Sequence, residues 1–118
     1  VDEAMNLHKE RIGIFEQLDN PDGRAHTLWS MARIELSREN PSEALRLLRE
    51  SHEINRSLGR LDGICFVGWD LGQLLARAGE TQEAVEVLRR SQDGFRQLGQ
   101  LDQAGKVQGF IDQLQQGD

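Results

Sequence analysis

The residue types that most often carry catalysis or bind metal are sparse in this chain of 118 residues. Its three histidines, His8, His26 and His52, stand far apart in the sequence. No H-x-x-x-H pair and no His/Cys pair occurs at metal-ligand spacing. Each histidine is therefore more simply interpreted as a solvated or core residue than as a ligand, and the sequence predicts no metal site.

The lone cysteine and the glycines make no better case for an enzyme. Cys65 stands beside Phe66 and Val67 in a predicted helix, where a packed thiol is the default over a nucleophile. The twelve glycines include no G-K-[ST] motif and follow no predicted strand, as a phosphate-binding loop would. The charged clusters fit solvated helix faces with i,i+4 pairs. We therefore expect no catalytic residues and no cofactor.

The strongest pattern is a step of forty residues, at which Trp29 falls on Trp69. Three further sets keep the same step: Glu3-Ala4, Glu43-Ala44 and Glu83-Ala84; Leu7, Leu47 and Val87; and Leu18, Leu58 and Leu98. A fixed period of about 20–50 residues is typical of stacked-repeat proteins, in which no single unit buries its own apolar face. The chain is therefore predicted to be built from repeated helical units.

Apolar residues at helical spacing predict the elements that would position any site. The predicted helices cover residues 2–19, 23–38, 41–58, 62–78, 81–98 and 102–116. Asp22 is the expected N-cap of the second helix. Gly59 and Gly99 are expected C-terminal caps, because glycine adopts positive φ without steric cost. Connections this short predict that neighbouring helices run antiparallel.

The composition narrows the class of protein. Hydrophobic residues make up 37% and charged residues 29%, which is ordinary for a soluble helical domain. A net charge of −6 argues against nucleic acid as the partner, because phosphate binding needs a concentrated basic surface. No run of about 18 apolar residues predicts a membrane span. A single cysteine fits a reducing compartment, so we expect a cytoplasmic location, and a chain that opens on Val1 suggests a piece of a longer protein.

The most ordered motif lies in residues 71–88. Leu71-Gly72, Leu74-Leu75, Gly79-Glu80, Ala84 and Leu88 stand at the spacing of the pattern L-G-x-x-Y/L, G-D/E, A-x-x-x-F/L. A looser copy runs through Met31-Ala32, Glu39-Asn40, Ala44 and Leu48, and a third keeps Ile111 and Leu114. This pattern resembles the tetratricopeptide repeat. A usual unit has about 34 residues, and the step of forty is similar to the longer-helix variety found in kinesin light chains and many bacterial signalling regulators.

The resemblance implies an all-α fold, a right-handed α-solenoid of about six helices in antiparallel pairs. It covers residues 1–118 as a single domain. The implied repeats are a partial one over 1–20, two full ones over 22–59 and 62–99, and a C-terminal capping helix over 102–116. Residues 102–116 are rich in Gln and Gly, which suits the polar outer face that a terminal repeat needs.

The resemblance also assigns faces, because the first helix of each pair lines the concave surface in such proteins. The implied peptide-binding groove contains His26, Trp29 and Arg33 in one repeat, and Phe66, Trp69, Gln73 and Arg77 in the next. Alternatively, the tryptophans fill space between adjacent helices, since a large aromatic residue is more often core than ligand platform. Both interpretations of the tryptophans stay open at this point.

Two functions fit these observations. The first is a protein-interaction module or scaffold that binds a peptide or helix of a partner, or of another domain of the same protein, in its groove. The alternative is a structural or oligomerising spacer within a larger signalling or regulatory protein. A module should expose tryptophan and arginine in the groove, whereas a spacer should bury them and expose apolar ends. We also expect weak homodimerisation through the first helix, where Ile12 or Phe15 would form an uncapped end.

Overall fold

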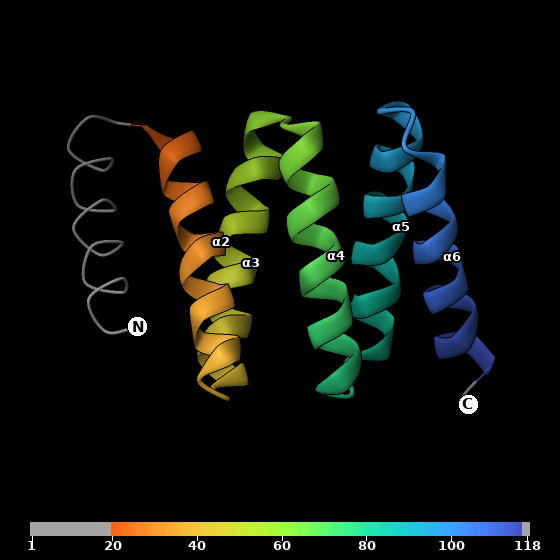
Figure 1. Cartoon of the computed structure of the whole chain (residues 1–118), viewed down its shortest axis with the longest axis horizontal. Helices are drawn as coiled ribbons and strands as arrows, with labels where there is room; N and C mark the ends of the chain where they lie inside the picture. The colour runs from red at the N-terminus through yellow and green to blue at the C-terminus, as the bar shows by residue number, and fades with distance from the viewer. Residues whose placement is uncertain (1–19, 117–118) are drawn as a thin grey trace. The chain divides into compact units, whose positions relative to one another are not determined.

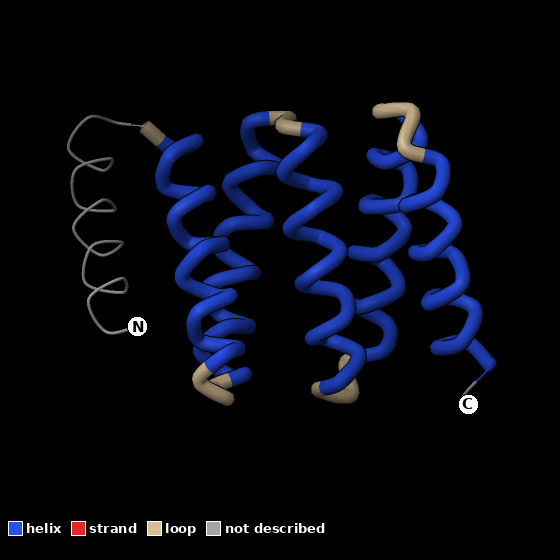
Figure 2. The backbone as a smooth tube through the Cα atoms, viewed as in Figure 1, coloured by secondary structure: helices blue, strands red, loops and turns tan. Residues whose placement is uncertain are grey.

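The computed structural model describes residues 20–116, which form an all-α structure. The helices are α2 (Pro21–Ser37), α3 (Pro41–Leu58), α4 (Leu61–Arg77), α5 (Thr81–Gln97) and α6 (Leu101–Gln116). No strand occurs in this part of the chain (Figure 2). Five of the six predicted helices are therefore confirmed, and the predicted helix over residues 2–19 lies outside the described residues.

The start of α2 differs from the prediction. The helix begins at Pro21, and the side chain of Asn20 caps it by accepting a hydrogen bond of 3.2 Å from the Gly23 backbone N–H. Asp22 lies inside the first turn, so its prediction as the N-cap was wrong. Proline suits the first helical position because its fixed φ matches the helix and its missing N–H would have no intrahelical partner.

The turns that follow α2, α4 and α5 close in the same way. In each, a backbone N–H just past the helix donates to a carbonyl five residues back: Asn40 to Glu35 at 2.9 Å, Glu80 to Leu75 at 2.9 Å and Gln100 to Phe95 at 2.8 Å. Gly59 and Gly99 have φ of 66° and 77°, which confirms both predicted caps. Glu39 takes the left-handed conformation without being glycine, at φ 59°. That costs about 1–2 kcal/mol and indicates that the repeat geometry overrides local preference here.

The chain divides into two compact units, Val1–Leu58 and Gly59–Asp118. In the first, α2 contacts α3; in the second, α5 contacts both α4 and α6 (Figure 1). One buried hydrogen bond recurs at the same step of forty: Ser51 Oγ donates to the Ala25 carbonyl at 2.7 Å, and Ser91 Oγ donates to the Cys65 carbonyl at 2.6 Å. The sequence repeat is thus a repeat of side-chain contacts as well as of helices.

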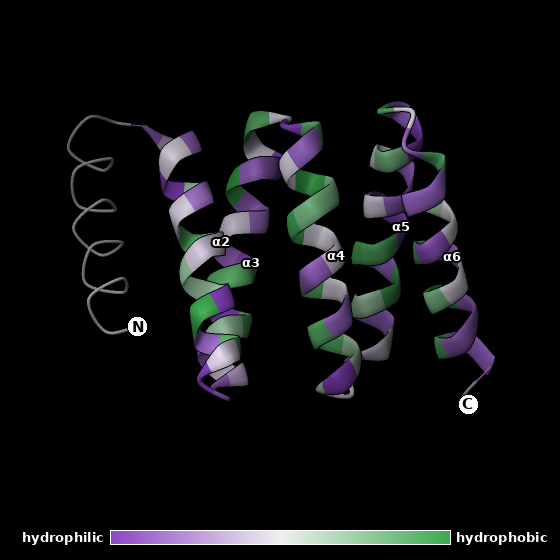
Figure 3. Cartoon of the chain, in the orientation of Figure 1, coloured by the Kyte–Doolittle hydropathy of each residue, from purple (hydrophilic) through white to green (hydrophobic). Residues whose placement is uncertain are grey.

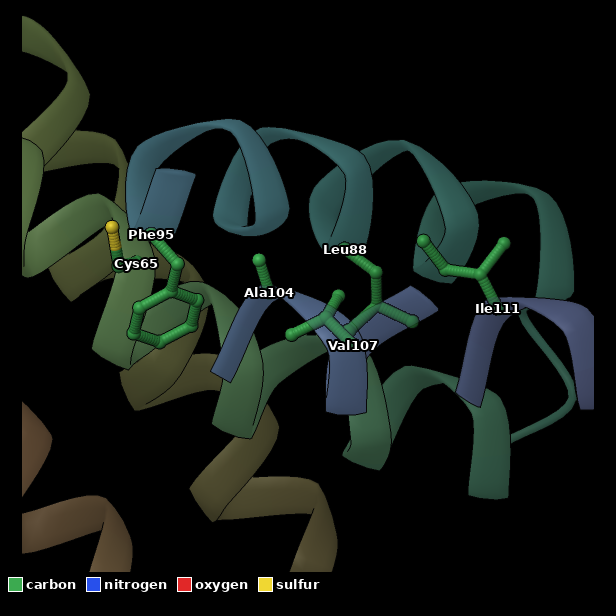
Figure 4. Packing of buried hydrophobic residues seen from close by; sticks show 6 residues of the cluster. All are labelled: Cys65, Leu88, Phe95, Ala104, Val107 and Ile111. Carbon is green, nitrogen blue, oxygen red and sulfur yellow. The ribbon is translucent and has the colours of Figure 1, made fainter. Parts of the chain in front are cut away.

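The core of the second unit joins all three of its helices. Its buried cluster consists of Cys65, Leu88, Phe95, Ala104, Val107 and Ile111 (Figure 4). Hydrophobic residues run along most of α4, which supplies much of the surrounding apolar surface (Figure 3). On α5, five residues of one face are buried: Ala84, Val87, Leu88, Ser91 and Phe95. Full burial of a side chain such as Phe95 contributes about 1.5–3 kcal/mol.

The core of the first unit contains a carboxylate that has no counterpart in the second. Glu35 is only 6% exposed and occupies the position that Leu75 has forty residues later. The Asn40 side-chain amide donates to Glu35 Oε2 at 2.8 Å, and Arg38 forms an ion pair with its other oxygen at 3.6 Å. A buried charge requires such partners. The two repeats therefore have the same helices and turns, but a buried carboxylate with polar partners stands near the end of α2 where a leucine stands in α4.

Two glycines let α4 and α5 approach closely. A Cβ atom on Gly72 would lie 2.4 Å from Leu88 Cδ2, and one on Gly94 would lie 2.3 Å from the sulfur of Cys65. Forty residues earlier, the positions of Cys65 and Gly94 hold Ala25 and Ile54. In the first repeat the larger of the two side chains belongs to the second helix, as Ile54 of α3. In the second repeat it belongs to the first helix, as Cys65 of α4.

We expect Gly94→Ala to destabilise the fold by roughly 1–3 kcal/mol, because the added methyl overlaps a fully buried thiol. Adding Cys65→Ala should recover much of this loss by removing the sulfur. Gly105→Ala is the control: a Cβ there meets nothing within 4 Å, so this variant should gain up to about 1 kcal/mol of helix propensity. Urea unfolding measures all three. Equal stability of Gly94→Ala and Gly105→Ala would contradict the prediction.

Candidate binding surface

Three of the predicted binding residues form a stack along α2. His26 and Arg33 are exposed and Trp29 is half-buried. The rings of His26 and Trp29 meet edge to face, with centroids 6.1 Å apart and an interplanar angle of 70°. The guanidinium carbon of Arg33 lies 5.4 Å from the centroid of the Trp29 ring. The three residues of this helix that were assigned to the groove are therefore in contact with one another.

This α2 stack combines a flat aromatic surface with hydrogen-bond donors. An exposed cation–π contact such as that of Arg33 with Trp29 contributes about 0.5–1 kcal/mol. It also limits the positions that the arginine side chain samples, so less conformational entropy is lost when a ligand binds the guanidinium. The stack is suited to hold a planar or negatively charged group.

The four predicted residues of the second unit follow one stripe of α4. Phe66 is 38% exposed, and its ring meets the buried ring of Phe95 edge to face at 5.3 Å and 87°. The Gln73 side-chain amide donates to the Trp69 carbonyl at 3.1 Å. Arg77 is exposed and ends the helix. An aromatic surface therefore stands at one end of the stripe and a cation at the other.

Trp69 has a packing role in addition to any binding role. It is half-buried against the core cluster, and its ring meets Phe110 of α6 edge to face at 5.7 Å and 86°. This packing is what the space-filling interpretation predicted for a tryptophan. Since part of the indole is exposed, binding of a ligand by Trp69 stays a prediction.

Sequence reasoning missed the contribution of α6 to this surface. Phe110 contacts Trp69, and Lys106, one turn earlier on α6, is exposed on the same side of that helix. The signal was present, because Lys106 stands forty residues after Phe66 and eighty after His26. The step of forty therefore extends the predicted stripe of binding residues into residues 102–116, which the sequence analysis assigned to a capping helix.

The cysteine and the described histidines lie apart from the stripes or differ in burial. Burial raises the pKa of the Cys65 thiol to about 11, with a smaller contribution from the negative charge of Asp62. The thiol is thus protonated at neutral pH and is a poor nucleophile. His52 is buried in α3, whereas His26 is exposed on α2. The described residues include no group of three or more His, Cys, Asp or Glu that could hold a metal ion.

A second surface feature lies at the turn between α5 and α6. A hollow of about 380 Å³ is lined by five consecutive residues, Gly99, Gln100, Leu101, Asp102 and Gln103. Leu101 is 69% exposed and Leu98 beside it is 41% exposed. Small-molecule sites are usually lined by convergent groups from several elements. The turn, with Leu98 and Leu101 exposed on it, is better described as an apolar end of the second unit.

Comparison with known proteins adds no assignment to this geometry. Neither a protein-family model nor a curated protein matches the sequence. Within residues 20–116, no helix has the length and apolar character required to cross a membrane. The stripes on α2 and α4 are therefore the observations from which function can be argued.

The contact between Trp69 and Phe110 should appear as an energetic coupling. In a double-mutant cycle with Trp69→Leu and Phe110→Leu, we expect a coupling of about 0.5–1.5 kcal/mol, as for other edge-to-face aromatic pairs. The control cycle combines Phe110→Leu with Leu98→Ala. Leu98 caps the end of α5, before α6 begins, and Phe110 stands more than two turns into α6. This pair should therefore be additive. Urea unfolding followed by circular dichroism provides the free energies, and a coupling no larger than in the control would contradict the contact.

Proposed function

We propose that this chain is a protein-interaction module that binds a peptide or helix of a partner on the stripes of α2 and α4. The observation that carries the proposal is Phe66, a large aromatic residue left 38% exposed beside the half-exposed Trp69. Aromatic residues and arginine are enriched at protein interfaces and dominate their energetics. The function proposed is binding, with no catalytic step.

The repetition of the stripe supports the proposal. His26, Trp29 and Arg33 stand on α2 forty residues before Phe66, Trp69 and Gln73 on α4. In the proposal the helix pairs stack with a right-handed twist, as in the tetratricopeptide repeat proteins that the motif resembles. The module then acts in the cytoplasm, where a lone cysteine stays reduced.

Substitution of Phe66 tests this function against a matched control. Peptides are first selected on the immobilised chain from a random twelve-residue display library. We expect Phe66→Ala to weaken the selected peptides tenfold or more, since loss of an aromatic interface anchor typically costs about 2 kcal/mol. The control Leu98→Ala removes a side chain of similar exposure, 41%, at the turn, and should change affinity less than about twofold. Fluorescence anisotropy measures both, and a library that yields no binder would overturn the proposal.

A second function is favoured by the apolar end of the second unit. Leu98 and Leu101 are exposed beside the hollow at the turn between α5 and α6. An oligomerising spacer would use such an end to pack against another subunit. The other expected contact, through Ile12 or Phe15, lies outside the described residues.

This second function predicts a concentration-dependent association that Leu101→Ser reduces. Serine removes the exposed apolar contact while leaving the start of α6 solvated, so the fold should be retained. Sedimentation equilibrium of the parent chain should show reversible association, which Leu101→Ser weakens and Phe66→Ala does not. A parent chain that stays monomeric up to about 1 mM would rule out the spacer function for this end.

A further inference from the structure

We infer that the partner segment is acidic at two points and apolar between them, and that it binds the second unit between Lys106 and Arg77. This inference rests on the proposed function and specifies the chemistry of its ligand. The surface concerned, the α4–α6 face, consists of Phe66, Trp69, Gln73 and Arg77 of α4 with Lys106 and Phe110 of α6.

The contact of Trp69 with Phe110 places the two cations relative to the aromatic residues. Helices α4 and α6 run in the same direction, because each is antiparallel to α5 (Figure 1). Phe66 and Lys106 each stand about one turn before that contact, on the side of their helix that carries it. Arg77 stands two turns beyond Trp69 on the same stripe. A cation therefore lies at each end of an aromatic surface.

These cations are not neutralised within the described part of the chain. There, no ion pair or hydrogen bond joins the side chain of Lys106 or Arg77 to another residue, although both are exposed. Three acids of α4 and α6 have partners of their own: Asp62 lies 3.5 Å from Arg60, Asp112 accepts a hydrogen bond of 2.8 Å from Gln108, and Asp70 interacts with another residue. Asp102 stands in the first turn of α6, where a negative charge stabilises the helix N-terminus.

The spacing of the cations sets the length of the ligand. Phe66, level with Lys106, and Arg77 are eleven residues apart in α4, which is about 16 Å at roughly 1.5 Å per residue. An extended peptide advances roughly 3.3 Å per residue. Two carboxylates about five residues apart therefore reach both cations while an apolar side chain between them lies on Phe66 and Trp69.

The outer helix α5 shows that charge alone does not make such a surface. Arg90 and Lys106 are both exposed, and each has an acid four residues before it, Glu86 and Asp102. Asp93 forms an ion pair with Arg96 at 3.7 Å. None of the exposed positions of α5 holds an aromatic residue. Arg90 is therefore the matched control for a cation outside the α4–α6 face.

The test uses peptides selected from the random library on the whole chain. We expect Asp and Glu to be enriched among them in pairs four to six residues apart, with an apolar residue between. Lys106→Gln and Arg77→Gln should each weaken the selected peptides about three- to tenfold, and Arg90→Gln less than twofold. Binding should also weaken as the salt concentration rises from 50 to about 300 mM. Melting temperatures of the three variants near that of the parent establish that the fold is kept.

A second selection on Lys106→Glu separates an electrostatic role from a structural one. The charge reversal should replace acidic residues by Lys or Arg at one end of the selected peptides. Selected peptides without an acidic excess, or equal effects of Lys106→Gln and Arg90→Gln, would overturn the inference and leave the proposed function standing. A library that yields no binder would overturn both.

Discussion

The hydrogen bond from a buried serine to a carbonyl of the preceding helix is the interaction on which each helix pair depends. Ser51 and Ser91 are fully buried, and their partners are the carbonyls of Ala25 and Cys65. A hydroxyl reaches a backbone carbonyl of a neighbouring helix only if the helices are close and correctly rotated. An unpaired hydroxyl at this depth would cost about 1–3 kcal/mol. The bond thus fixes the rotation of the first helix and directs one stripe of it away from the second.

The sequence predicted the helices well because their ends carry strong local signals. Pro41 begins α3, and a glycine with positive φ follows each of α3, α4 and α5. The predicted bounds of α3 to α6 agree with the structure to within about one residue. The predicted start of α2 was wrong because Asn20 and Asp22 are both good N-cap residues, and only the position of Pro21 decides between them. The left-handed conformation of Glu39 has no signal in the residue itself, and only its position forty residues before Gly79 points to it.

The candidate surface could be predicted only in part. Offsets of three and four residues correctly brought His26, Trp29 and Arg33 together, because helical neighbours follow from the sequence alone. The contact of Trp69 with Phe110 could not be foreseen, since it joins residues forty-one positions apart through the packing of α6. For the pair Phe66 and Phe95 the sequence did better: Phe66, assigned to the groove, is partly exposed, whereas Phe95 is fully buried.

Half-buried aromatic residues link binding to stability in the second unit. Trp69 packs on Phe110 and on the core cluster while part of the residue stays exposed, so a ligand on its open side would hold in place a ring that also supports the core. Any ligand that binds only the folded chain stabilises it, by about 2.7 kcal/mol at a free concentration of one hundred times Kd. Because Phe66 contacts the buried Phe95 edge to face, the same linkage extends to the first turns of α4. Occupation of this surface should therefore stiffen α4 and α6 together, and a partner would be recognised by a face that becomes more ordered as it binds.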